Sequence, residues 1–329
     1  MKKKIFAFLI AATFICCAFF FNGGVAYAAE GYKVYLGGLP AGFNMQTRGA
    51  YIAGLSDVIT EDGIKSPSKD AGLKCGDVIY YIENTEVNSA KDVERVISLT
   101  SGEITVEYSR CGNAYTTEIT PAKDLQGDKK LGIFIRDDIS GIGTITYIDK
   151  DRIATLGHPV LDDNGGLLKI TKGEIFGCNI TGCVKGERGA PGELRGVIMK
   201  NNQIGKIESN TEYGVFGTLN DKFDAQNLKE IEIGEGKMGD AVIYSTVEGD
   251  TPQDYSISII KADNTFSDSR NYVVKITDKR LLKATGGIVQ GMSGSPIVQN
   301  GKLIGAITHV FINDPTRGFG ISINNMLNK

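Results

Sequence analysis

Tryptophan is absent from this 329-residue chain, and histidine occurs only twice. Beyond the N-terminal segment, the cysteines form just one closely spaced pair, Cys178 and Cys183, so the sequence lacks the ligand clusters of a structural zinc site. Basic residues are not in excess either, since the formal net charge is −3, and no nucleic-acid-binding motif occurs. We therefore expect no metal, no cofactor and no nucleic acid partner.

Glycine and short β-type runs are what the chain has in abundance. There are 42 glycines, and short runs rich in Val, Ile, Thr and Tyr recur between turn signals, whereas long helical periodicity is nearly absent. This pattern predicts a mainly β fold with frequent turns. A chain of 329 residues is too long for one small core, so we expect two folded domains.

The N-terminus has the pattern of an export signal. Three lysines at positions 2–4 precede an uncharged apolar run from Ile5 to Phe21, and the small-residue motif Ala26-Tyr27-Ala28 follows. These are the charged, apolar and cleavage-site regions of a secretory signal, with cleavage predicted after Ala28. The apolar run is at the short limit for a spanning helix, so residues 1–28 are either a signal peptide or an N-terminal membrane segment.

Residues 32–122 have the pattern of one small domain. Ser89 is placed to cap a helix whose apolar face consists of Val93, Val96 and Ile97, at spacings of three and four residues. The last two strands of the unit are predicted at Ile104–Tyr108 and Ala114–Ile119.

The stretch Ser66–Ile97 resembles a PDZ domain, a small β-domain with two short helices, and the match extends over most of residues 32–122. The resemblance implies that Leu39–Met45 forms the carboxylate-binding loop and the start of the groove strand. A bound peptide would add as an extra strand between this segment and the helix at 90–98. The residues implied in the groove, for each of which plain core packing is the alternative, are Gly42, Phe43, Met45, Val93 and Ile97.

Polar residues 123–130 are predicted to form a linker to the rest of the chain. Beyond them, residues 131–329 contain many short, closely spaced strands, which favours paired β-barrels or sandwiches. Residues 173–196, rich in glycine and charge, are expected to form a long exposed loop. Cys178 and Cys183 are close enough in sequence to bridge it, although sequence alone fixes no cysteine pairing.

The run Gly291-Met292-Ser293-Gly294-Ser295-Pro296 lies between two apolar stretches that are predicted strands. A serine between glycines is how trypsin-like peptidases present a nucleophile, because glycine lets the backbone turn tightly beside a substrate carbonyl. In that geometry the Ser293 hydroxyl attacks, and the amides of Gly291 and Ser293 form an oxyanion hole. The same residue types also fill ordinary loops.

A serine nucleophile needs a base, and the two histidines leave two candidates. His158 follows an apolar strand and precedes Ser293, which matches the His, Asp, Ser order of trypsin-like enzymes. His309 ends the strand after the nucleophile and is expected to line the substrate cleft. Many aspartates lie between His158 and Ser293, and Asp278 stands out because it follows a strand shortly before the nucleophile.

Residues 141–160 and 276–321 resemble the stage IV sporulation protein B serine peptidase family of endospore-forming bacteria, and the similarity covers essentially the whole mature chain. The resemblance implies a trypsin-like double β-barrel after the PDZ domain, with His158, Asp278 and Ser293 as catalytic residues. It further implies self-cleavage and export across the forespore membrane into the intermembrane space. There the enzyme would cut a membrane-bound regulator of an intramembrane metalloprotease and so trigger late sigma-factor activation.

Two other interpretations stay open. A catalytically inactive PDZ adaptor or signalling protein would have the same domains, although the complete nucleophile motif argues against it. An envelope quality-control protease of the HtrA type also combines these domains, but it normally places the protease first. Met292 stands where activated zymogens have an aspartate that pairs with a freed N-terminus, so we expect control through the PDZ domain instead. No residue in the sequence identifies the substrate side-chain preference.

Overall fold

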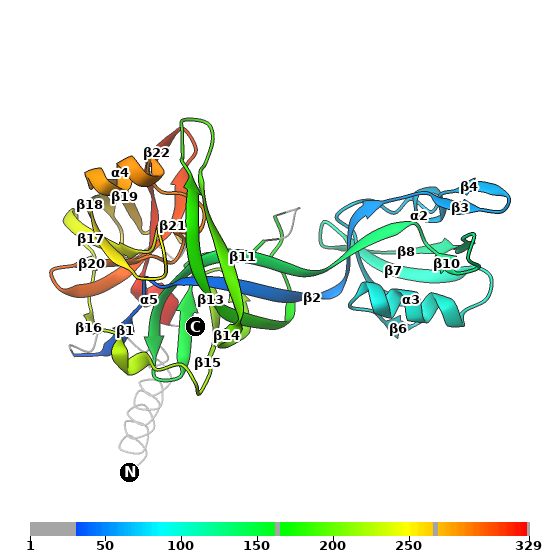
Figure 1. Ribbon diagram of the computed structural model, residues 1–329, viewed down its shortest axis with the longest axis horizontal. Coiled ribbons are helices and arrows are strands. Elements are labelled where there is room, and N and C mark those ends of the chain that lie inside the picture. Colours follow the sequence, from blue (N-terminus) through cyan, green and yellow to red (C-terminus); the bar gives the residue numbers. More distant parts are fainter. Residues whose placement is uncertain (1–30, 162–164, 266–268, 328–329) are drawn as a thin grey trace, which may run out of the picture.

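The computed structural model describes residues 31–161, 165–265 and 269–327. The proposed signal peptide, residues 1–28, lies outside these ranges. The described chain is mainly β and consists of a large part and a small part, which a two-stranded ribbon connects (Figure 1). Within these ranges, no helix is both long enough and apolar enough to span a membrane.

The small part has the strands and two short helices of the predicted PDZ domain. Its elements are β3 (Val58–Thr60), β4 (Gly63–Lys65), α2 (Pro67–Asp70), β5 (Val78–Ile82), β6 (Thr85–Glu86), α3 (Ala90–Leu99), β7 (Ile104–Arg110), β8 (Asn113–Ile119), β9 (Ala122–Lys123) and β10 (Lys129–Lys130). The Ser89 side chain caps α3 by accepting a hydrogen bond from the Asp92 N–H. The predicted apolar face of α3, Val93, Val96 and Ile97, is buried in the core of this part.

A buried ion pair ties the turn before β5 to β7. The Asp77 side chain is 1% exposed and accepts hydrogen bonds of 2.7 Å from both Nε and Nη2 of Arg110. Asp77 also accepts a hydrogen bond from the Lys74 N–H at 2.8 Å. The paired carboxylate holds the pKa of Arg110 above its usual value. The two-pronged contact compensates the burial of a charge that would otherwise be costly.

Six strands of the large part close into a first β-barrel. In order of pairing they are β2 (Pro40–Leu55), β11 (Ile133–Asp149), β12 (Arg152–Thr155), β15 (Gly214–Leu219), β14 (Glu193–Thr211) and β13 (Ile170–Val184), which pairs again with β2. Every neighbouring pair is antiparallel. The barrel interior is filled by apolar side chains that include Phe43, Ile145, Ile153, Ile175 and Val215.

A second barrel closes in the same way from six later strands. These are β17 (Gly239–Ser245), β18 (Gln253–Ala262), β19 (Tyr272–Ile276), β22 (Asp314–Ser322), β21 (Lys302–Phe311) and β20 (Pro296–Gln299), which returns to β17. Its core includes Ile243, Ile257, Val274, Ile297 and Ile307, each at most 1% exposed. The two closed barrels confirm the predicted double-barrel fold.

Short elements join the two barrels. β1 (Lys33–Leu36) pairs with β11 and with β16 (Glu230–Ile233), and β16 runs parallel to β21. The helices α4 (Lys279–Thr285) and α5 (Ile323–Leu327) lie beside the second barrel, and a 3₁₀ turn spans Ala225–Asn227. β1 and β16 therefore link β11 of the first barrel to β21 of the second barrel.

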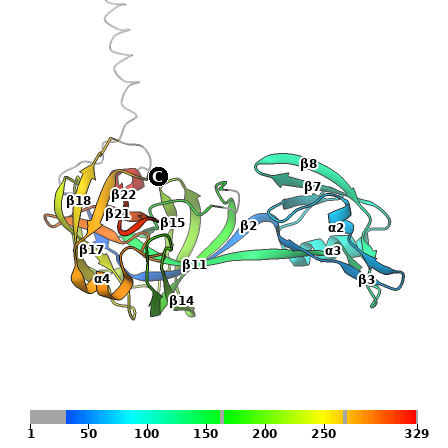
Figure 2. The same cartoon turned by 90° about the horizontal axis from the view of Figure 1, so that it is seen from above.

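The ribbon that connects the two parts consists of β2 and β11, each of which belongs to both (Figures 1 and 2). The first half of β2 pairs with β13 of the barrel, whereas Ala50 and Tyr51 pair with β5 of the PDZ domain. This corrects the predicted boundaries: residues 33–46 belong to the barrels, although the sequence places them in the PDZ domain. Residues 123–130 are also more than a linker, because they form the β9–β10 hairpin of the PDZ domain.

The segment 173–196 is not a loop. Most of it belongs to the long hairpin of β13 and β14, with only the connection near residues 185–192 outside the two strands. Cys178 and Cys183 are free thiols on the same strand, five residues apart. An extended strand rises about 3.3 Å per residue, so their Cα atoms lie on the order of 16 Å apart, too far for a disulfide. The suggested staple is therefore wrong.

Candidate active site

The loop from Gly291 to Ser295 lies at the cleft between the barrels, directly before β20. Gly291 has φ +95°, and Gly294 has φ +93°. A Cβ at Gly294 would lie 2.2 Å from the carbonyl oxygen of Thr144, so only glycine fits this close approach to β11. The glycines flanking Ser293 thus have the role that the sequence motif predicts.

The N–H groups of Gly291 and Ser293 are oriented by hydrogen bonds to the carbonyl at the other side of the same peptide unit. The Gln290 carbonyl accepts a hydrogen bond from the Leu194 N–H at 2.9 Å, and the Met292 carbonyl accepts one from the Ser295 N–H at 3.0 Å. In a trans peptide the C=O and the following N–H point in opposite directions, so the amides of Gly291 and Ser293 point away from these contacts. Neither amide donates a hydrogen bond to another described residue. Both residues line the same cavity. This is the arrangement that an oxyanion hole requires.

Two threonines of β11 hold the loop from the first barrel. The Thr144 N–H donates to the Ser293 carbonyl and its hydroxyl donates to the Gly291 carbonyl, both at 2.9 Å. The Thr146 hydroxyl donates to the Gly294 carbonyl at 2.8 Å. The loop that carries the nucleophile is therefore attached to both barrels.

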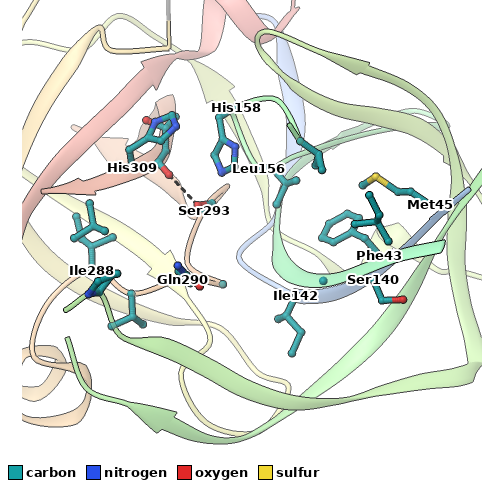
Figure 3. A pocket seen from close by; sticks show the side chains of 18 of the residues that line it. Phe43, Met45, Ser140, Ile142, Leu156, His158, Ile288, Gln290, Ser293 and His309 are labelled. Carbon is teal, nitrogen blue, oxygen red and sulfur yellow. Dashed lines mark hydrogen bonds between the residues drawn. The ribbon is translucent and has the colours of Figure 1, made fainter. Parts of the chain in front are cut away.

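His158 follows β12 and lines the same cavity as Ser293 (Figure 3). Its Nδ1 lies 2.8 Å from the carbonyl oxygen of Pro159. A carbonyl can only accept, so Nδ1 carries the proton and Nε2 of the neutral ring keeps its lone pair. Burial lowers the pKa of His158, which keeps the ring neutral near pH 7. His158 is thus prepared to accept a proton through Nε2.

Asn210 of β14 fixes the peptide on which His158 depends. Its Oδ1 accepts from the Val160 N–H at 2.9 Å, and its Nδ2 donates to the carbonyls of Val160 and Leu168 at 2.7 and 2.9 Å. The Val160 N–H belongs to the same peptide as the Pro159 carbonyl. Because the two groups point in opposite directions, the contact with Asn210 turns the Pro159 carbonyl toward His158.

The Ser293 hydroxyl donates to the carbonyl of Thr308 at 2.8 Å (Figure 3). The hydroxyl therefore has to rotate before it can engage His158. The imidazole of His309, one residue after Thr308, stacks on that of His158 with ring centroids 4.8 Å apart and a tilt of 38°. As the sequence predicts, His309 lines the cleft.

Asp278 is not brought to His158. It is the N-cap of α4 and accepts hydrogen bonds from the backbone N–H groups of Arg280 and Leu281 at 2.8 and 3.3 Å. Its Oδ2 also lies 2.8 Å from Nη2 of Arg280, and this partner lowers the pKa of Asp278 to about 2. Asp278 does not line the cavity. In this structure Nδ1 of His158 contacts the Pro159 carbonyl and not Asp278. The role of Asp278 as the orienting acid, which the resemblance implies, therefore stays a prediction.

The predicted PDZ groove is corrected in part. Val93 and Ile97 of α3 do line a groove, but its other walls are Leu131, Gly132, Ile133 and Ile135 around the start of β11, together with residues 56–59 and 124–126. Phe43 and Met45 instead lie in the first barrel, where they line the cavity beside Ser293, and Gly42 pairs with Phe176 of β13. The error arises because a strand sequence does not reveal which sheet it joins.

Four residues that orient the nucleophile loop or His158 are not among those predicted from the sequence: Thr144, Thr146, Pro159 and Asn210. Thr144 and Thr146 are nearly fully buried in an apolar strand, at alternate positions that face one side. Buried hydroxyls at that spacing are a signal for an obligatory partner. Asn210 and the Pro159 carbonyl give no such signal, because their contacts depend on long-range packing.

Metal chemistry has no candidate centre here: among the described ranges, no three His, Cys, Asp or Glu side chains cluster as metal ligands. A nucleophile-type serine, a neutral histidine and two unengaged amides at one cleft, on two β-barrels with a PDZ domain, define a serine peptidase.

The family model of the SpoIVB peptidase S55 matches residues 127–327, and the chain belongs to this family. The zinc metalloprotease RasP of Shouchella clausii is 31% identical over 104 residues, covering 30% of this chain. The chain spans a quarter of that relative's length.

Two solved structures are similar to parts of the chain. The PDZ domain of the SdrC-like protein from Listeria monocytogenes has 22% identity and a TM-score of 0.23, covering 27% of this chain and 90% of that one. The active form of the Rv3671c protease from M. tuberculosis has 15% identity and a TM-score of 0.35, covering 58% of this chain and 72% of that one.

Proposed function

We propose that this chain is a secreted serine endopeptidase of sporulation that uses Ser293 as nucleophile and His158 as base. The observation that carries the catalytic proposal is the pair of oriented, unengaged amides at Gly291 and Ser293, in one cavity with a histidine whose Nε2 is the basic nitrogen. A loop that served only packing would have no reason to hold two amides away from every described acceptor.

The chemistry follows from these positions. The Ser293 hydroxyl leaves the Thr308 carbonyl, and its oxygen attacks the scissile carbonyl carbon while Nε2 of His158 takes the proton. The amides of Gly291 and Ser293 donate to the oxyanion that forms. His158 then returns the proton to the leaving amine, and water attacks the acyl-enzyme in a second, equivalent cycle.

The biological setting is part of the same proposal. Membership of the SpoIVB peptidase family supports export across the forespore membrane, self-cleavage, and cleavage of a membrane-bound regulator of an intramembrane metalloprotease. The signal-like N-terminus supports export. The PDZ groove, which Val93, Ile97, Leu131, Ile133 and Ile135 line, would bind a segment of such a partner or of the chain itself.

The test is self-cleavage and peptide hydrolysis by the exported form, compared with Ser293→Ala. Ser258→Ala, on β18 and outside the cavity, is the matched control. We expect the control to cut like wild type and Ser293→Ala to lose activity by about a factor of 10⁶. Equal activity in all three proteins would place the nucleophile elsewhere. Inactivity of all three, without labelling of Ser293 by a fluorophosphonate, would favour the adaptor.

A further inference from the structure

The cavity at Ser293 is uncharged. It has a volume of about 470 Å³, and no described residue that lines it is Asp, Glu, Lys or Arg. Its polar groups are two imidazoles, three hydroxyls, one amide side chain and the backbone. Apart from these groups, the surface offered to a substrate consists of aliphatic, methionine and phenylalanine side chains.

The apolar side chains form two separate walls, one from each barrel. The first barrel contributes Phe43, Met45, Ile139 and Leu156. The second barrel and its loops contribute Ile288, Val289, Val310 and Ile312. Figure 3 shows Ile288 on one side and Phe43 and Met45 on the other, with Ser293 between them.

A peptide cleaved at Ser293 must pass between these walls. Its scissile carbonyl has to reach the amides of Gly291 and Ser293, and in an extended peptide the side chains directly before and after the bond point to opposite sides, here toward the two walls. A charged side chain at either position would be desolvated without an opposite charge to pair with, whereas an apolar one would gain from burial.

We propose that the substrate of this peptidase carries apolar side chains on both sides of the scissile bond. This inference rests on the proposed function and adds the substrate class that the sequence does not give. The site selects apolar segments, such as those that adjoin a membrane-inserted stretch, and rejects the basic and acidic sites that charged specificity pockets accept.

Internally quenched peptides test the proposal. The parent peptide has leucine or phenylalanine on each side of the bond, and lysine or aspartate replaces one of them at a time. We expect each charged replacement to lower kcat/KM about tenfold or more at either position. Cleavage of the charged peptides at parental rates would overturn the proposal while leaving the peptidase function intact. Loss of all cleavage, with Ser293→Ala indistinguishable from wild type, would instead refute the function.

Two variants identify the walls. Ile312 is 59% exposed, so Ile312→Asp is compatible with the fold, and Val197→Asp, at a side chain also 59% exposed but outside the cavity, is its control. Ile139→Asp probes the opposite wall, with Phe134→Asp, on the same strand but outside the cavity, as control. We expect each cleft variant to raise kcat/KM for the lysine peptide on its own side of the bond about tenfold relative to its control. No gain on either side would contradict the assignment of both walls.

Discussion

Replacing Asn210 by alanine should impair catalysis without touching any group that reacts. The substitution removes three hydrogen bonds, to the Val160 N–H, the Val160 carbonyl and the Leu168 carbonyl. The peptide between Pro159 and Val160 then loses the contact that turns its carbonyl toward Nδ1 of His158. The imidazole is left without a fixed orientation.

The magnitude follows from these contacts. Hydrogen bonds contribute about 0.5–1.5 kcal/mol each, and the site is half-buried, so we expect Asn210→Ala to lower the free energy of unfolding by roughly 2 kcal/mol. Misorientation of the base should lower kcat by about 10²-fold, with a smaller change in KM, because the binding walls are unaffected.

The pH profile separates positioning from mere instability. Burial lowers the pKa of His158, whereas its contact with the Pro159 carbonyl raises it, so loss of that contact in Asn210→Ala should lower the pKa further. The acidic limb of kcat/KM, on which activity rises as His158 loses its proton, should therefore shift to lower pH in Asn210→Ala. The assay is hydrolysis of a quenched peptide between pH 5 and 9, well below the melting temperature of each protein.

Asn202→Ala is the control, since Asn202 is an exposed asparagine on the same strand. It should leave kcat, its pH profile and stability unchanged. If Asn210→Ala lost stability but kept the kcat and pH profile of wild type, the chain of contacts from Asn210 to His158 would have no catalytic role.

Three further predictions concern other contacts. Thr144→Val removes the hydroxyl that donates to the Gly291 carbonyl, so kcat should fall about tenfold. Thr144→Ser keeps a hydroxyl at this position, so its kcat should stay near that of wild type. Arg110→Ala leaves the buried Asp77 unpaired and should lower the free energy of unfolding in urea by about 3–5 kcal/mol; a loss below 1 kcal/mol would show that the pair contributes little. The pKa of Asp278 is about 2 in the folded protein against 3.8 ordinarily, so its contribution is complete above about pH 4 and is lost as the pH falls toward 2. Asp278→Ala should therefore destabilise the protein by about 1–2 kcal/mol at pH 6 and much less at pH 2.5, as urea midpoints at both values will show.

The sequence predicts those features that depend on local pattern. The helix capped by Ser89 needs only its cap and its apolar spacing, and both are visible in the residues. The nucleophile loop needs glycines at positive φ, which the motif supplies directly at Gly291 and Gly294. The mainly β character follows from short apolar runs between turns.

The features that depend on pairing between distant strands are not predictable in this way. Phe43 and Met45 alternate as a groove strand would, and only the register with β11 and β13 places them in the barrel. Likewise, Ile133 and Ile135 border the PDZ groove because their strand, β11, runs on from that domain into the barrel. Tertiary context thus decides which sheet a strand of suitable pattern joins.

Because β2 and β11 belong to both parts, the PDZ domain takes the place of the turn between the two strands of a hairpin. β2 and β11 are neighbours in the first barrel, and the whole domain is inserted where a hairpin of this kind usually has a turn of a few residues. While the domain is unfolded, it is a long flexible loop whose closure opposes the pairing of the two strands. Once folded, it holds Leu55 beside Ile133 and starts their register. We therefore expect the inserted domain to fold before β2 and β11 pair in the barrel, so that the path of the chain couples folding of the peptidase to folding of the PDZ domain.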